Sequence, residues 1–275
     1  MATDLSSHGI SAAELNATLG TDRHPLVIDV RRAHAFQASP RLIAGSAYRA
    51  PEEVEGWQAA LPRDTRIVVT CAHGHEVGQN AAAALRTYGL DARYLIDGVE
   101  GWLEARRPSQ GKSTVYDGTK PTRWVTRARP KIDRIACPWL IKRFVDPFAE
   151  FHYVPAQDVE AMSEKLHAIP FDIPGVDFSH HDEGCSFDAM IERFDLTDPT
   201  LDRLATIVRG ADTSRLDLAP QSAGLYAISL GLSDLYQDDH AMLAAGMTIY
   251  DALYRWQRNL TGETHAWPPR ATGAA

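Results

Sequence analysis

The chain has 275 residues, which is enough for one large or two medium domains, and two is the better expectation. A hydrophobic fraction of 44% with 23% charged residues is typical of a globular protein, and no apolar run approaches the roughly 18 residues of a membrane span. A net charge of -8 argues against a nucleic-acid partner, and three widely separated cysteines do not form a disulfide framework. The first ten residues lack the features of a secretion signal, so we expect a soluble cytoplasmic protein without a membrane partner, whose cysteines remain thiols.

Strands and helices are predicted to alternate over the first hundred residues. Ser11 and Glu14 fit a capping box that opens a short helix ending near Gly20. The apolar runs that predict buried strands lie at residues 26–31, 66–70 and 92–96. Helical patterns follow the second and third runs, at residues 76–88 and 99–105. Strands alternating with helices at this spacing predict an α/β fold with a parallel sheet covered on both faces.

A polar stretch is expected to divide the chain. Residues 109–122 contain Gly and Pro, show no periodicity, and are predicted to link a first domain, residues 1–108, to a second, residues 123–270. The second domain is predicted to be mixed α+β at first and mostly helical after residue 185. Its early elements are expected as strands at 124–128 and 150–154 and helices at 136–144 and 159–167.

Cys71 stands between a predicted strand and a predicted helix. Backbone N–H groups converge at such a position and stabilise anionic sulfur, from which a structural cysteine would gain nothing. The loop that follows carries His73, His75 and Glu76 and is too polar for a core segment. We therefore expect Cys71 to be reactive. Near neutral pH the two histidines can add partial positive charge or transfer protons, and the alternative is two surface histidines on an ordinary loop.

Four stretches carry a family resemblance in the first half. They are LVIDVR at 26–31, RLIAGSAYRA at 41–50, VVTC at 68–71 and LIDGVEGW at 95–102. With them, the first hundred or so residues resemble a rhodanese (sulfurtransferase) domain. The resemblance implies a rhodanese-like parallel sheet and a catalytic cysteine, here Cys71, that accepts a sulfane sulfur and becomes a persulfide. Gly74 matches the family's spacing, and Asp29 and Arg31 belong to its strand motif, where Asp29 is expected to order nearby loops.

The loop after the cysteine departs from that family in one respect. The residues expected to hold the substrate are Ala72, His73, Gly74, His75 and Glu76. Many rhodaneses place an arginine five residues after the cysteine to hold an anionic donor such as thiosulfate, whereas this sequence has Glu76. Because a carboxylate repels a dianion, we expect the sulfane-sulfur donor to be the persulfide of a partner protein or of a small thiol. The expected acceptor is a thiol or the second domain.

The second half begins with a basic and aromatic segment. Residues 123–155, together with 176–194 and 198–213, resemble the C-terminal domain of the chromate-resistance protein family (ChrB type), over about Arg123 to Arg258. The resemblance implies a link to chromate resistance, and some members are chromate-responsive regulators. No helix-turn-helix candidate precedes the basic segment, so we do not expect this chain to bind DNA as a regulator would.

An oxyanion site is one interpretation of the basic segment. A tetrahedral dianion such as chromate needs several cationic donors, and the candidates here are Arg127, Lys131 and Arg134. The alternative is a solvated face whose charges are paired elsewhere.

A metal site is a competing interpretation of the same half. Histidines, acids and a cysteine gather between His180 and Asp188, and Asp212 adds an acid at a helix end. Mixed nitrogen and oxygen ligands suit iron, manganese or zinc, although no cofactor is certain. The resemblance aligns His180 and Asp188 with family positions, and these two with Asp212 are the expected ligands. The alternative is a polar loop with one capping aspartate.

The function expected from the sequence is that of a sulfurtransferase linked to chromate or oxyanion resistance. Cys71 would take the sulfur and the loop amides would stabilise the persulfide. Two alternatives remain. One is a non-enzymatic chromate sensor, in which the basic segment binds the anion and the rhodanese fold is a binding module. The other is a metal-dependent activity in the second domain.

Overall fold

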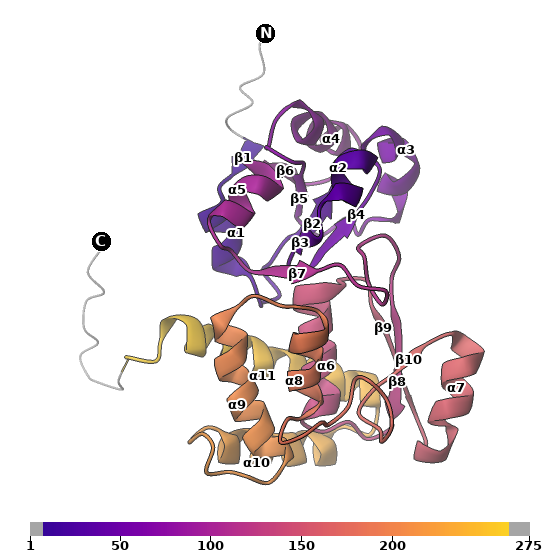
Figure 1. The fold of residues 1–275 in the computed structure, drawn as a ribbon, viewed down its shortest axis with the longest axis vertical. Coiled ribbons are helices and arrows are strands. Elements are labelled where there is room, and N and C mark those ends of the chain that lie inside the picture. The colour runs from indigo at the N-terminus through magenta and orange to yellow at the C-terminus, as the bar shows by residue number, and fades with distance from the viewer. Residues whose placement is uncertain (1–7, 264–275) are drawn as a thin grey trace.

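The computed structural model describes residues 8–263, which form an α/β part and a mostly helical part lying against each other (Figure 1). Residues 1–7 and 264–270 of the expected domains lie outside the described residues. The first part contains β1 (Gly9–Ile10), α1 (Ala12–Thr18), β2 (Leu26–Asp29), α2 (Ala33–Ala38), β3 (Arg41–Ile43), β4 (Ser46–Tyr48), α3 (Val54–Trp57), β5 (Ile67–Thr70), α4 (Glu76–Thr87), β6 (Ala92–Leu95) and α5 (Gly98–Glu104). The second contains β8 (Arg123–Arg127), α6 (Asp133–Leu140), β9 (Glu150–Val154), α7 (Val159–Leu166), β10 (Ile169–Pro170), α8 (Ser186–Arg193), α9 (Pro199–Asp212), α10 (Ser222–Leu235) and α11 (Asp239–Asn259).

A five-stranded parallel sheet forms the centre of the first part. Its strand order is β1-β6-β5-β2-β4. Successive side chains of a strand point to opposite faces, so Val27 and Val68 pack with α1 and α5 while Ile28 and Val69 pack with α3 and α4. The predicted capping box is present at Ser11 and Glu14. The α/β fold with both faces of a parallel sheet covered is thereby confirmed.

The segment expected to be a linker, residues 109–122, is ordered and carries a strand, β7 (Ser109–Gly111), which pairs antiparallel with β3. The Gln110 side chain is buried and donates to the Val145 carbonyl at 2.8 Å. Tyr116 is also buried, and its hydroxyl donates to the Ser46 carbonyl at 3.0 Å. The polar groups of this segment find partners far away in the sequence, which composition alone does not reveal.

Within the described residues, the second part combines a small sheet with six helices, α6 to α11. Its parallel strands have the order β10-β8-β9. The helix expected at 136–144 begins three residues earlier, at Asp133, and its last turn, Ile141–Val145, is π-helical. The fully buried Trp139 lies in the core, where its ring contacts Phe144 in the last turn of the same helix and aromatic side chains of α8 and α11. This mixed, mostly helical architecture was predicted.

One hydrophobic cluster joins the two parts. Leu19, Phe36 and Leu42 of the first part belong to the same buried cluster as Trp139 of the second. The Gly45 amide donates to the Phe144 carbonyl at 2.7 Å, across this interface. Among residues 8–263, no helix has the length and apolar character needed to cross a membrane.

Candidate functional site

Cys71 lies where the sequence predicted it, at the C-terminal edge of the parallel sheet. β5 ends at Thr70 and α4 begins at Glu76, so the cysteine opens the loop between them. The side chain is 6% exposed, and its thiol donates to the His75 carbonyl at 3.8 Å. A Cβ placed on Gly78 would lie 3.2 Å from the Cys71 Sγ, so the first turn of α4 lies directly against the sulfur.

Two glycines fix the shape of the Cys71 loop. Gly74 has a φ of +71°, and a Cβ there would lie 2.6 Å from the Leu95 carbonyl oxygen. Gly98 opens α5 with a φ of +60°, and a Cβ there would lie 2.5 Å from the Ala72 oxygen. The α5 amides of Val99 and Glu100 donate to the carbonyls of Cys71 and Ala72, at 2.9 and 3.0 Å. These two hydrogen bonds attach the Cys71 loop to the first turn of α5.

A pocket of about 240 Å³ opens at Cys71. Four of the five loop residues expected to hold the substrate line it, and Gly74 provides the turn between them. The lining residues are Arg31, Arg32, His34, Ala35, Cys71, Ala72, His73, His75, Glu76 and Val77. The pocket thus combines a thiol, three imidazoles, two guanidinium groups and one carboxylate.

The Asp29 and Arg31 side chains form a buried ion pair beside this pocket. Arg31 donates through Nε and Nη2 to the Asp29 carboxylate, at 2.9 and 2.7 Å, and both side chains are almost fully buried. Burial raises the pKa of Asp29, and the positive charge of Arg31 opposes that shift. Because each charge neutralises the other, Arg31 offers little net attraction to an anion in the pocket.

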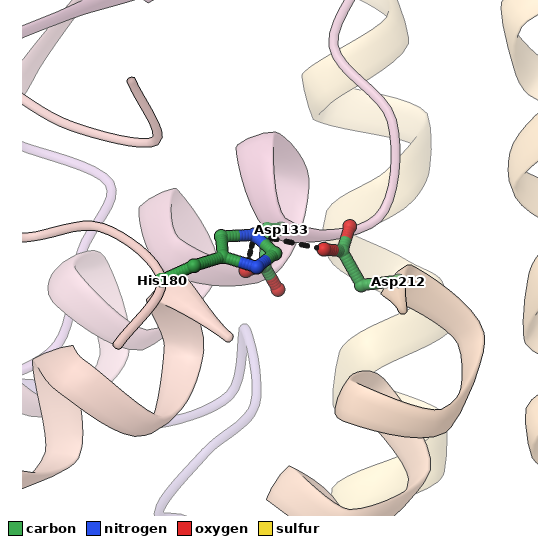
Figure 2. A group of neighbouring side chains, drawn as sticks. All are labelled: Asp133, His180 and Asp212. Atoms are coloured by element: carbon green, nitrogen blue, oxygen red, sulfur yellow. Dashed lines mark ion pairs between the residues drawn. The ribbon is translucent and has the colours of Figure 1, made fainter. Parts of the chain in front are cut away.

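A second group of polar side chains lies in the second half, where three segments meet (Figure 2). Asp133 begins α6, Asp212 ends α9, and His180 comes from the loop before α8. His180 Nε2 lies 3.1 Å from Asp212 Oδ2 and 3.7 Å from Asp133 Oδ2. One potential ligand atom from each residue lies within 4.8 Å of those of the other two. We call Asp133, His180 and Asp212 the acidic cluster.

The pKa shifts in the acidic cluster have a common electrostatic origin. Side-chain hydrogen bonds with Asp172 and Asp212 raise the pKa of His180 to about 10. Burial raises the pKa of Asp133 well above its usual range, and the negative charges of Asp212 and Asp172 add to the effect. The cluster therefore favours a positive charge at its centre.

Asp172 borders the cluster and engages two of the arginines expected to bind an oxyanion. Arg127 Nη2 and Arg134 Nε lie 3.0 and 3.2 Å from Asp172 Oδ2. Its other oxygen, Oδ1, lies 3.4 Å from His180 Nε2. Lys131, the third expected cation, is half-buried. Two of the three expected oxyanion donors are thus already bound to a carboxylate.

Asp188, expected as a metal ligand, lies outside the acidic cluster. Its carboxylate accepts from the Cys185 amide at 2.9 Å and pairs with Arg209 at 3.2 Å. Cys137 and Cys185 are both fully buried, and burial raises the pKa of each thiol. Neither thiol is placed to react as an exposed nucleophile.

Sequence reasoning did not identify Asp133 and Asp172 as site residues. Asp133 stands within a basic segment, and it meets the second group of residues through Ser186, at the start of α8, whose amide donates to the Asp133 carboxylate at 2.6 Å. Asp172 has a φ of +53° and accepts from the Ser186 hydroxyl at 2.9 Å. Asp97, Asp182 and Asp195 share this left-handed conformation, so no local feature marks Asp172 as a site residue.

Comparisons with known proteins match one family to each half of the chain. Residues 11–105 match the rhodanese-like domain, and residues 124–257 match the family described as ChrB, C-terminal domain. Protein ChrB of Cupriavidus metallidurans is 32% identical over 158 residues, which are 57% of this chain and 45% of that protein. Thiosulfate sulfurtransferase GlpE of Stutzerimonas stutzeri is 34% identical over 73 residues, which are 26% of this chain and 64% of that protein. The chain spans less than two thirds of either relative.

Among solved structures, a rhodanese-related protein from Thermoplasma volcanium is similar to the first part. The two chains are 27% identical, and the match covers 37% of this chain and 96% of that one with a TM-score of 0.33.

Proposed function

Because the chain carries a rhodanese-like domain followed by a ChrB C-terminal domain, we propose that its first half is a sulfurtransferase and that Cys71 carries the transferred sulfur. The observation that carries the proposal is the position of Cys71. Its sulfur lies against the first turn of α4 and faces a pocket open to donors. Rhodanese-like domains also occur without catalytic activity, so the test has to detect the persulfide on Cys71 directly.

The proposed reaction has two balanced steps. The Cys71 thiolate attacks the outer sulfur of a persulfide donor, a new S–S bond forms on Cys71, and the donor leaves as a thiolate. An acceptor thiolate then attacks the outer sulfur of the Cys71 persulfide and regenerates the cysteine. No external oxidant or reductant is needed, because one S–S bond is broken for each one formed.

The charges of the pocket favour a persulfide over thiosulfate as the donor. Glu76 places a carboxylate in the lining that offsets the charge of Arg32, and the charge of Arg31 is neutralised by Asp29. A dianion gains less from such a pocket than from one that presents a free arginine at position 76. A volume of about 240 Å³ suits a small thiol persulfide or the tip of a partner protein's cysteine.

We extend the proposal to the setting in which the reaction occurs. The ChrB-type domain supports a role under chromate or other oxyanion stress, in a cytoplasm that keeps thiols reduced. The sensor alternative has weaker support, because Arg127 and Arg134 are bound to Asp172 and are not free for an oxyanion.

Intact mass spectrometry tests the proposal directly. The purified chain and its Cys71→Ser variant are incubated separately with glutathione persulfide, cysteine persulfide and thiosulfate, and the sulfur is then located by peptide mapping. We expect a gain of about 32 Da, one sulfur atom, on Cys71 with the persulfide donors, and no gain in the variant. The buried Cys137 and Cys185 are internal controls and should remain unmodified.

Two outcomes would contradict the proposal. One is no mass gain with any donor, which would leave the first half a binding module. The other is a gain that persists in Cys71→Ser, which would place the sulfur on another residue.

A further inference from the structure

Three carboxylates surround a single histidine nitrogen in the second half. His180 Nε2 has Asp212, Asp172 and Asp133 oxygens at 3.1, 3.4 and 3.7 Å. The His180 side chain is 43% exposed and that of Asp212 is 17% exposed, whereas Asp133 is almost fully buried. The group of side chains is therefore partly exposed to solvent at His180 and Asp212.

Two of the three carboxylates around this nitrogen have no arginine or lysine partner. Arg127 and Arg134 both pair with the third, Asp172. Within residues 8–263, no arginine or lysine forms an ion pair with Asp133 or Asp212; each has only His180. Binding of a cation by Asp133 and Asp212 would therefore displace no arginine or lysine partner.

Asp133 supplies a second and independent observation. Its carboxylate is 1% exposed, and although Oδ2 accepts from the Ser186 amide, Oδ1 has no hydrogen-bond partner in the described part of the chain. A buried carboxylate oxygen without a partner is costly, and burial of an ionised carboxylate is tolerated when the group is paired or coordinates a metal. In Figure 2 this carboxylate lies directly beside the His180 imidazole.

We propose that Asp133, His180 and Asp212 bind one divalent transition-metal ion. One imidazole and two carboxylates suit Mn²⁺, Fe²⁺ or Zn²⁺ better than they suit Mg²⁺ or Ca²⁺, which prefer oxygen ligands alone. Ligand atoms at about 2.1 Å from one ion are at most about 4.2 Å apart, so separations within 4.8 Å need only sub-ångström movements. Asp172 accepts from Ser186 and Arg127 and pairs with Arg134, and its Oδ1 borders the proposed site at 3.4 Å from His180 Nε2.

Binding of Mn²⁺ to the full chain tests this site. The protein is treated with EDTA, dialysed, and titrated with MnCl₂ while the free Mn²⁺ is measured by electron paramagnetic resonance. The variants are His180→Asn and Asp212→Asn, because both side chains are partly exposed and their replacement leaves the core intact. The matched control is His181→Asn, since His181 is the neighbouring histidine, is 45% exposed, and pairs with Glu192 outside the cluster.

We expect one Mn²⁺ per wild-type chain and a loss of affinity of at least tenfold in His180→Asn and in Asp212→Asn. His181→Asn should bind like the wild type, and Zn²⁺ should displace the bound Mn²⁺ in all proteins that hold it. The proposal is overturned if the wild type binds no stoichiometric Mn²⁺ or Zn²⁺. It is also overturned if the two cluster variants bind as well as the control while their circular dichroism and Tm match the wild type. Neither result bears on sulfur loading of Cys71, which involves none of these residues.

Discussion

The contact between Gly98 and the Cys71 loop can be tested by adding a single methyl group. In Gly98→Ala the new Cβ would lie 2.5 Å from the Ala72 oxygen and 2.6 Å from the Gly74 nitrogen, and the φ of +60° is unfavourable for alanine. All of the obstructing atoms belong to the backbone, so they cannot move aside without shifting the loop. Gly89→Ala is the matched control, because Gly89 has a φ of +79° but no atom lies within 4 Å of the place that its Cβ would take.

The two substitutions separate backbone strain from steric overlap. Left-handed backbone costs a non-glycine residue about 1–2 kcal/mol, and this is the whole expected cost of Gly89→Ala. Overpacking adds about 1–3 kcal/mol, so Gly98→Ala should lose about 2–5 kcal/mol of unfolding free energy. Urea unfolding measures both values. We also expect slower persulfide formation on Cys71 in Gly98→Ala alone, followed by intact mass. Equal stability and equal loading rates in the two variants would refute this geometry of the loop.

Three further predictions concern the first half. Glu76→Arg should speed sulfur loading from thiosulfate about tenfold relative to Glu76→Gln, with a smaller change for a singly charged alkyl persulfide, as judged by rates of mass gain. Asp29→Ala should cost about 3–5 kcal/mol in urea unfolding because it leaves the Arg31 guanidinium buried without its partner, and a loss under 1 kcal/mol would contradict the buried pair. Burial, with added repulsion from two arginines, lowers the pKa of His24 from 6.5 to about 4. The unfolded chain therefore binds this proton more readily, and stability should fall by about 3 kcal/mol as pH drops from about 6.5 to 4. His24→Asn, which can keep a hydrogen bond to Thr18, should flatten that slope in unfolding measured across the same pH range.

The sequence was sufficient to predict the parts of the fold that depend on local pattern. Short stretches rich in apolar residues marked β2, β5 and β6, because a strand buried on both faces needs no polar alternation. The position of Cys71 followed from the same pattern, since the loop begins where β5 ends. Alternation of strand and helix then determined that the strands run parallel.

Features that depend on distant partners were not predictable in this way. Asp188 lies eight residues after His180 in the sequence, yet α8 directs its carboxylate to Arg209, while Asp133, 47 residues before His180, joins the cluster. The strand β7 was hidden for a similar reason, because its polar residues are paired with β3 and with Val145. Spacing along the chain reports helix faces and strand faces, but not which loop meets which helix end.

The two candidate sites lie in different parts of the molecule, which makes their independence testable. The acidic cluster contains the first residue of α6, whereas the Phe144 carbonyl, past the other end of that helix, meets the first half at Gly45. At about 1.5 Å per helical residue, α6 and its π-helical turn place about 15 Å between the cluster and the interface. The pocket at Cys71 shares no residue with the cluster.

If the pocket at Cys71 and the acidic cluster are independent, a substitution in one should leave the other unchanged. Cys71→Ser should bind Mn²⁺ with wild-type affinity, and His180→Asn should accept sulfur on Cys71 at the wild-type rate. Equilibrium titration and intact mass measure the two quantities on the same preparations. A change of fivefold or more in either cross-measurement, with Tm preserved, would indicate coupling through the shared core around Trp139. In that case the ChrB-type half would act on sulfur transfer at a distance, because the geometry gives the two sites no direct contact.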